Sequence, residues 1–504
     1  MIPRSFPLTS AATALRSLTG VRRFAAALGF GGLMALAMPP FDLFPLVWLC
    51  LPSLIFLLQG TSNGKQAFLT GWSFAFGFFV FGLYWIAHAM FVDLARFWWA
   101  IPLAATGLPA FFALYYGLAA ALARRMGLQG IRGALTFGGL WFLADWLRGH
   151  CFTGFPWNLL GYTWDGVLPV LQTTAFIGIY GLTFLTGLAA SSTAALIDSQ
   201  RASRVVFISG LALFGGLGLA GLVRLHTTPI GDVPSIRVRL VQPAISQIDK
   251  HNGTERYTHF QSLIALSAAP GPLPVTHVFW PETASPYYLA EEKEARRDMA
   301  THMPPSVRAI ITGSIRRTVD PDGVTAFYNA LVAIDPRGNL VASYDKAHLV
   351  PFGEFMPLRR YNPLPALAAS ATDFSRGDGV RSLRVKDLPP FSALICYEVI
   401  FSGVVADQTD RPGFLLNATN DGWYGHTTGP FQHFAIARVR AIEEGLPLLR
   451  VANTGISGII DPLGRVRASL ALDERGTLDG ALPQSLPPTF FARYGEGRIL
   501  STLF

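Results

Sequence analysis

Charged residues are scarce in this sequence, and they are unevenly placed. They make up 14% of the 504 residues, whereas hydrophobic residues make up 51% and the mean hydropathy is +0.37. A composition this apolar excludes an ordinary soluble protein and predicts a membrane-embedded part. Residues 24–223 carry few acids or bases, and residues 224–504 hold most of both. The shift in composition therefore marks a boundary between two domains.

Cysteine is also rare. The three cysteines, Cys50, Cys151 and Cys396, share no CxxC spacing and leave one thiol unpaired in any pairing, which argues against a disulfide scaffold. The sequence has no HExxH motif, no cluster of ligand-type side chains at metal-binding spacing and no phosphate-binding loop. We therefore expect neither a metal nor a cofactor. The net charge of +8 is scattered over short loops, so no nucleic-acid partner is expected.

Seven apolar runs are candidates for helices that cross about 30 Å of hydrocarbon. They are residues 24–38, 44–58, 66–90, 98–122, 131–147, 170–197 and 205–223. If the N-terminus is cytoplasmic, ten Lys and Arg residues flank these runs on the inside and two, Arg96 and Arg148, lie outside. The predicted topology is a transmembrane domain over residues 1–224 in a bacterial inner membrane, with everything after Arg224 in the periplasm.

The second half has the pattern of a layered α/β domain, which we place at residues 235–480. Short β-rich runs alternate there with helical patterns and turn sequences. Strands are predicted at residues 236–241, 277–280, 309–312, 330–334, 340–344, 391–395, 414–417 and 448–451. Helices are predicted at residues 255–268, 290–301 and 431–444. Turns at residues 335–339 and 461–465 link paired strands.

Three residues with catalytic potential follow predicted strands. They are Glu282, Lys346 and Cys396. Functional groups gather at the carboxyl ends of strands in layered α/β folds. Each has an ordinary alternative: a helix-capping Glu, a solvated Lys and a core Cys. As a set they suit acyl transfer, because a carboxylate can take the thiol proton and an ammonium can stabilise the oxyanion. A Cys–His pair with His348 is a second possibility.

At these residues the sequence resembles the nitrilase superfamily, and more closely its membrane branch, the apolipoprotein N-acyltransferases. The resembling stretches are residues 155–162 (FPWNLLGY), 241–243 (VQP), 280–283 (WPET), 345–355 (DKAHLVPFGEF), 396–398 (CYE), 420–425 (NDGWYG) and 450–455 (RVANTG). The resemblance covers nearly the whole chain. It implies a multi-span α-helical membrane domain followed by an α-β-β-α sandwich, without a cofactor.

The resemblance also implies roles for individual residues. Glu282 would be the general base, Lys346 the oxyanion stabiliser and Cys396 the nucleophile. Glu354 would support the lysine. Tyr397, Glu398 and Trp423 match positions near the pocket.

The implied reaction moves an acyl chain from a membrane phospholipid, through a thioester, to the N-terminal amine of a diacylated apolipoprotein. Two alternatives remain open: a membrane-anchored amidase or hydrolase, and a catalytically silent lipid-binding scaffold. Residues 481–504 depart from the family pattern, because they are too short and polar for the family's last membrane helix.

Overall fold

The computed structural model of the protein describes residues 7–198, 201–250, 255–271, 273–319, 321, 323–361 and 373–503. The chain divides into two compact units. The first comprises Met1–Thr227, Thr427–Ala435 and Glu496–Phe504, and the second comprises Thr228–His426 and Ile436–Gly495. Helix α14 (Gly429–Glu444) begins in the first unit and ends in the second.

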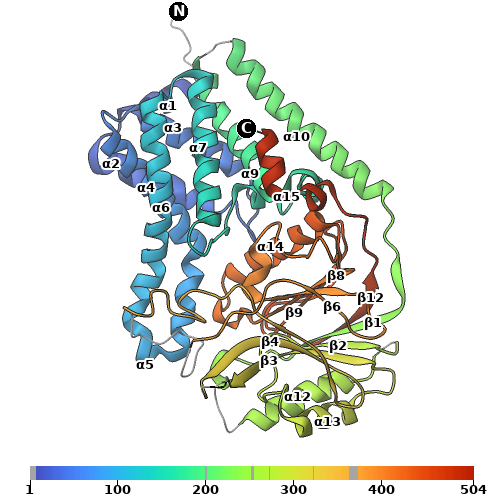
Figure 1. The fold of residues 1–504 in the computed structure, drawn as a ribbon. Coiled ribbons are helices and arrows are strands. Elements are labelled where there is room, and N and C mark those ends of the chain that lie inside the picture. The colour runs from blue at the N-terminus through green and yellow to red at the C-terminus, as the bar shows by residue number, and fades with distance from the viewer. Residues whose placement is uncertain are drawn as a thin grey trace, which may run out of the picture. The chain divides into compact units, whose positions relative to one another are not determined.

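The first unit is helical (Figure 1). Its α-helices are α1 (Pro7–Ser17), α2 (Gly20–Ala35), α3 (Pro45–Gln59), α4 (Gly64–Leu83), α5 (Leu94–Phe97), α6 (Ile101–Met126), α7 (Gly130–His150), α8 (Leu168–Leu171), α9 (Thr174–Ser192) and α10 (Arg201–Thr227), and the last segment lies in α15 (Phe490–Leu503). All seven predicted apolar runs overlap helices of this unit. Three described helical segments are long and apolar enough to cross a membrane: Gly64–Met126, Thr174–Ile197 and Arg201–Thr227. The 63-residue first segment contains two of the predicted runs.

Small residues let the helices of this unit approach closely. A Cβ on Gly31 of α2 would lie 1.8 Å from the carbonyl oxygen of Phe74 in α4. A Cβ on Gly71 of α4 would lie 2.4 Å from the Cβ of Ala120 in α6. Such close backbone contact at small residues is typical of helices that pack in a membrane.

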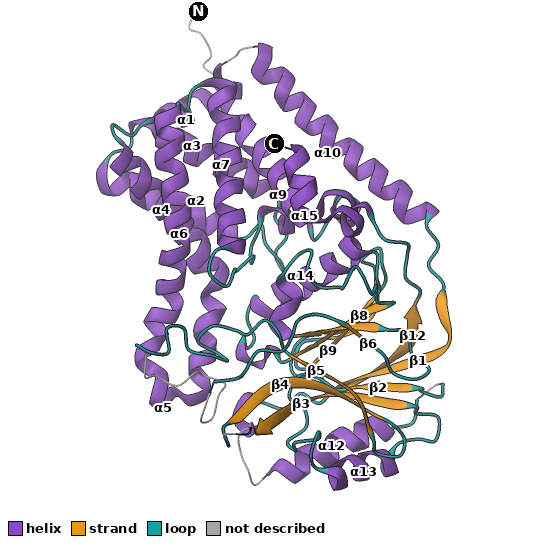
Figure 2. Ribbon diagram, viewed as in Figure 1, coloured by secondary structure: helices purple, strands orange, loops and turns teal. Residues whose placement is uncertain are grey.

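The second unit contains two six-stranded sheets, drawn in orange in Figure 2. The first has the order β12-β1-β2-β3-β4-β5 and the second β11-β10-β9-β8-β7-β6. The strands are β1 (Asp232–Gln242), β2 (His277–Phe279), β3 (Ala309–Val319), β4 (Thr325–Ile334), β5 (Leu340–Asp345), β6 (Ser382–Leu383), β7 (Phe391–Ile395), β8 (Phe414–Thr419), β9 (Leu448–Ala452), β10 (Ser457–Ile460), β11 (Val466–Leu470) and β12 (Gly476–Pro483).

Helices cover the outer faces of the two sheets. Helices α12 (Arg256–Ala268) and α13 (Lys293–His302) lie against the first sheet, and the part of α14 from Ile436 onward lies against the second (Figure 1). The predicted α-β-β-α sandwich is thus confirmed. The eight predicted strands are all present, and both predicted turns join antiparallel pairs, β4–β5 and β10–β11. Four observed strands are not among the eight predicted ones: β6, β10, β11 and β12. Of these, β10 and β11 were implied by the predicted turn at residues 461–465, whereas β6 and β12 were missed altogether.

The strand directions place the predicted catalytic residues at strand ends. Strands β1, β2 and β3 run parallel in the first sheet, and β7, β8 and β9 run parallel in the second. Glu282 lies just beyond the carboxyl end of β2, and Cys396 lies immediately beyond that of β7. Lys346 follows β5, which is antiparallel to β4. The fold therefore needs only short segments after these strands to present the three side chains.

Candidate active site

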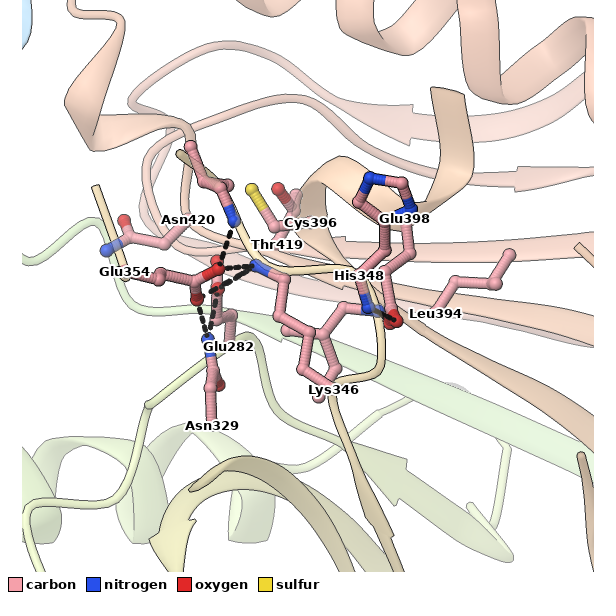
Figure 3. Close-up of polar contacts among 12 residues, drawn as sticks. Glu282, Asn329, Lys346, His348, Glu354, Leu394, Cys396, Glu398, Thr419 and Asn420 are labelled. Atoms are coloured by element: carbon pink, nitrogen blue, oxygen red, sulfur yellow. Dashed lines mark hydrogen bonds and ion pairs between the residues drawn. The ribbon is translucent and has the colours of Figure 1, made fainter. Parts of the chain in front are cut away.

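The structure brings Glu282, Lys346 and Glu354 together (Figure 3). The Lys346 ammonium lies 3.5 Å from Glu282 Oε1 and 2.9 Å from Glu354 Oε2. It also donates to Glu354 Oε1 at 3.0 Å. All three side chains are buried, and Glu354 accepts a further hydrogen bond, from the Val350 amide at 2.9 Å. The site thus holds an ammonium between two carboxylates, away from bulk water.

Asn329 joins the two carboxylates and was not anticipated from the sequence. Its Nδ2 donates to Glu282 Oε1 and to Glu354 Oε1, each at 2.8 Å. The backbone carbonyl of Asn329 accepts from the Lys346 amide at 2.8 Å. Asn329 therefore bonds to Glu282, to Glu354 and to the backbone of Lys346. The only signal in the sequence is a polar residue at the start of the apolar run 330–334. That signal is weak, because polar residues at strand ends are common.

The charges around Lys346 decide its protonation state. Burial alone would lower the pKa of an ammonium, but the nearby carboxylates of Glu354 and Glu282 outweigh it and raise the pKa of Lys346 above its ordinary value. Lys346 is therefore a permanent cation over the physiological pH range. A fixed, desolvated cation is suited to stabilising negative charge that develops on a neighbouring oxygen.

Cys396 occupies the sharp turn that follows β7. Its φ is 51°, which a residue with a Cβ rarely adopts. The residue begins the short helix η6 (Cys396–Ile400) and lies beside the Lys346 cluster in Figure 3. The hydroxyl of Tyr424 is 3.9 Å from its Sγ, another contact that the sequence analysis did not anticipate. The strained turn thus places Cys396 beyond the end of β7, beside the charged groups.

The thiol is neutral at rest. Burial and the negative charge of Glu282 raise the pKa of Cys396 to about 12, although the positive charge of Lys346 acts in the opposite direction. A preformed thiolate is thus disfavoured, and the thiol needs a base to become a nucleophile. Of the nearby carboxylates, Glu282 raises the pKa of the Cys396 thiol the most.

Glu398 lies under the site and links two of its strands. Its Oε1 accepts hydrogen bonds from the Tyr344 hydroxyl at 2.8 Å and from the amides of Ala347 and His348 at 2.8 and 3.0 Å. Its Oε2 accepts from the Ile395 amide at 2.8 Å. Tyr344 and Ala347 lie on either side of Lys346, and Ile395 immediately precedes Cys396. The buried Glu398 carboxylate therefore links the segment that carries Lys346 to the segment that carries Cys396.

The remaining predicted residues lie close by, with different surroundings. Tyr397 is buried, and its ring contacts Phe401 and His348 at centroid distances of 5.0 and 5.6 Å. His348 stacks on Phe401 at 3.9 Å. These contacts place the imidazole in an aromatic cluster and give no support to a Cys–His pair. Trp423 ends the short helix η7 (Asp421–Trp423) and is half-buried.

The described residues contain no group of three or more His, Cys, Asp or Glu side chains arranged to hold a metal ion. The side chains that come together at the site supply a thiol, carboxylates, an ammonium and an amide. This set is suited to nucleophilic acyl transfer, in which a thiol attacks a carbonyl and a nearby base moves its proton.

Both halves of the chain match known families. A family model described as the apolipoprotein N-acyltransferase N-terminal domain matches residues 30–192, and one described as carbon-nitrogen hydrolase matches residues 237–487. An apolipoprotein N-acyltransferase of Rhodopseudomonas palustris is 39% identical over 95% of this chain and 92% of its own length. One of Bradyrhizobium diazoefficiens is 41% identical over the same shares. The chain belongs to the apolipoprotein N-acyltransferase family.

The order of domains in this apolipoprotein N-acyltransferase family member is the one predicted from its motifs. An amidase of Nesterenkonia sp. is similar in structure at 16% identity, covering 55% of this chain and 100% of its own, with a TM-score of 0.37. The two apolipoprotein N-acyltransferases, each of which matches 95% of this chain, confirm the family resemblance inferred from residues 280–283, 345–355 and 396–398.

Proposed function

We propose that the protein transfers an acyl chain from a membrane phospholipid to the N-terminal amino group of a diacylglyceryl-cysteine on apolipoproteins. The acyl chain is carried between the two substrates as a thioester on Cys396. The observation that carries this proposal is the convergence of a base, a fixed cation and a thiol at the ends of β2, β5 and β7 in a member of this family. The family membership supports the class of acceptor, and the geometry of the site supports the chemistry.

In the first step, the Cys396 sulfur attacks the ester carbonyl of the phospholipid while Glu282 takes the thiol proton. Because the pKa of the thiol is about 12, the proton transfer and the attack must be coupled. The tetrahedral oxyanion forms next to the Lys346 ammonium. One such preorganised donor typically contributes about 2.7–4 kcal/mol to transition-state stabilisation. The intermediate collapses when Glu282 returns the proton to the departing lysophospholipid oxygen, leaving a thioester.

In the second step, the free amine of the lipoprotein attacks the thioester carbonyl. Glu282 accepts a proton from the attacking nitrogen, Lys346 again stabilises the oxyanion, and the sulfur leaves as the new amide forms. The same proton then restores the Cys396 thiol. Glu354 and Asn329 keep their positions throughout: Glu354 holds the ammonium, and Asn329 holds the two carboxylates at 2.8 Å.

The same proposal gives a reason for joining an apolar helical half to this catalytic half. Both substrates carry acyl chains that reside in a bilayer, so anchoring the enzyme raises their effective concentration at the site. We place the chain in the bacterial inner membrane with a cytoplasmic N-terminus, about seven spans over residues 1–224, and residues 235–480 facing the periplasm. The excess of Lys and Arg in alternate loops supports this orientation.

The test is a transfer assay with the purified, detergent-solubilised protein. Phospholipid and a diacylated lipopeptide with a free amine are the substrates, and the lipopeptide mass is the readout. We expect the wild type and Cys151→Ala to add one acyl chain, and Cys396→Ala to add none. The Cys151 change is the matched control because this half-exposed thiol lies in the helical half. Fatty acid released to water would instead indicate a hydrolase, and binding without turnover would indicate a scaffold.

A further inference from the structure

Asn417 and Arg450 form a buried polar layer directly beneath the nucleophile turn. Leu394, Asn417 and Arg450 lie in register across the three parallel strands β7, β8 and β9. Both polar side chains are fully buried. A buried carboxamide and guanidinium are costly to desolvate, so their hydrogen bonds must compensate fully.

The Asn417 amide group bridges the two sides of the turn. Its Nδ2 donates to the carbonyl of Leu394 and to the carbonyl of Cys396, each at 3.2 Å. The first carbonyl lies in the last part of β7, and the second lies after the strained φ of 51°. The two hydrogens of one NH₂ group thus tie the strand to the turn. A left-handed backbone conformation is unfavourable for a residue with a Cβ, and it persists only where the surrounding structure imposes it.

Arg450 determines which way the Asn417 amide faces. Its Nη1 donates to Asn417 Oδ1, its Nη2 donates to Asp421 Oδ2 at 2.7 Å, and its Nε donates to the Ile456 carbonyl at 3.2 Å. With the guanidinium held at three points, the oxygen of Asn417 must face Arg450. Its NH₂ must therefore face the turn.

The same network reaches the thiol from a second side. Asp421, which accepts from Arg450, also accepts the one hydrogen of the Thr419 hydroxyl at 2.9 Å. Thr419 lies next to Cys396 (Figure 3). Arg450 is therefore linked to the Cys396 carbonyl through Asn417, and to Thr419 beside the Cys396 side chain through Asp421.

We propose that Asn417, oriented by Arg450, is a positioning residue that imposes the strained turn and so aims the Cys396 thiol at Glu282 and Lys346. This inference rests on the proposed role of Cys396 as nucleophile. Asn417 touches no reacting atom. Its effect is expected in kcat rather than in substrate binding, because misplacing a reacting group by about 1 Å can cost about 10²-fold in rate.

The informative variants are Asn417→Asp and Asn417→Leu. The aspartate keeps the size of the side chain and still pairs with Arg450, but it faces the two carbonyls with an acceptor. The leucine is neutral and has no donor. The matched control is Ser392→Ala, which removes a different buried donor, on the neighbouring strand β7: the hydroxyl that binds the Val405 carbonyl at 2.7 Å. All four proteins are compared by Tm, by kcat and KM in acyl transfer, and by the rate at which iodoacetamide alkylates Cys396.

We expect both Asn417 variants to lose at least about ten-fold in kcat with KM within about two-fold, and to alkylate more slowly than wild type. Ser392→Ala should lose stability but keep kcat. The proposal is overturned if the Asn417 variants lose no more kcat than Ser392→Ala does at equal Tm. It is also overturned if neither Asn417 variant folds. If the wild type itself transfers no acyl chain, the proposed function fails separately, and the alkylation rates still decide whether Asn417 positions the thiol.

Discussion

Gly313 offers a sharp test of how the base is positioned. It lies in β3, and its amide and carbonyl both bond to the segment that carries Glu282: Gly313 N donates to the Pro281 carbonyl, and the Ser285 amide donates to the Gly313 carbonyl, each at 3.1 Å. A Cβ at Gly313 would lie 2.3 Å from the Thr283 nitrogen and 2.4 Å from the Pro281 oxygen. Gly313→Ala must therefore displace backbone rather than rotate a side chain.

The magnitude follows from this overlap. Cβ contacts are essentially never below 3.0 Å, so the Thr283 nitrogen must move from 2.3 Å to at least that distance, a shift of about 0.7 Å. Glu282 precedes this atom by one peptide bond, and its carboxylate is held at 2.8 Å by Asn329. Overpacking of this kind typically costs about 1–3 kcal/mol of stability. A shift approaching 1 Å in a reacting group costs up to about 10²-fold in rate. We expect a kcat loss of roughly 10- to 100-fold.

The assay is the acyl-transfer reaction with Tm measured on the same samples. The control is Gly476→Ala in β12, where the added Cβ would meet only Leu470 Cδ2 at 3.8 Å, an ordinary contact. If Gly313 acts through Glu282, then Gly313→Ala should add little to the loss already caused by Glu282→Gln. A kcat within two-fold of wild type, or full additivity with Glu282→Gln, would refute the reasoning.

Three further outcomes are expected. Since the pKa of Cys396 is about 12, its alkylation by iodoacetamide should keep rising with pH up to pH 10, and a plateau near pH 7 would contradict a neutral resting thiol. Glu398→Gln should lower both Tm and kcat, because the new NH₂ cannot accept from the Ile395 amide; unfolding by urea should show a loss of about 1–3 kcal/mol. Burial raises the pKa of Glu444 from 4.5 to about 7, so the stability this carboxyl contributes is present below pH 4.5 and is lost as pH rises through 7. The glutamine of Glu444→Gln can still accept from Gln408. This variant should therefore be more stable than the wild type above pH 7, by up to ~3 kcal/mol in the free energy of unfolding and with a higher Tm, and nearly equal to it below pH 5. Equal shifts in Tm at both pH values would be inconsistent with this.

Much of the fold was predictable because its signals are local. The strand at residues 391–395 is a short apolar run bounded by turn residues, and the structure places β7 at the same residues. The loops at residues 335–339 and 461–465 carry the Asp-Pro and Gly signals of tight turns, and both join antiparallel strands. Strand β12 was missed because it pairs with β1, more than 230 residues away, and its own pattern is weak.

The site was predictable only in part, for a related reason. Glu282, Lys346 and Cys396 follow strong strands, so their position at strand ends could be inferred. The residues that orient them are scattered along the chain: Asn329 bridges two carboxylates, and Asn417 bridges two carbonyls. Such roles depend on which strands are neighbours, and the order of strands is a long-range property that no local pattern encodes.

The central claim is that Cys396 carries the acyl chain, and the intact mass of the protein tests it most directly. The detergent-purified protein is incubated with phospholipid alone, and then with a diacylated lipopeptide that has a free amine. We expect one added acyl mass on the wild type, located on the peptide that contains Cys396, removed by hydroxylamine and discharged by the lipopeptide. Cys396→Ala should show no such mass. An acyl mass that persists on Cys396→Ala, or a wild type that transfers acyl chains without ever carrying one on Cys396, would contradict the account.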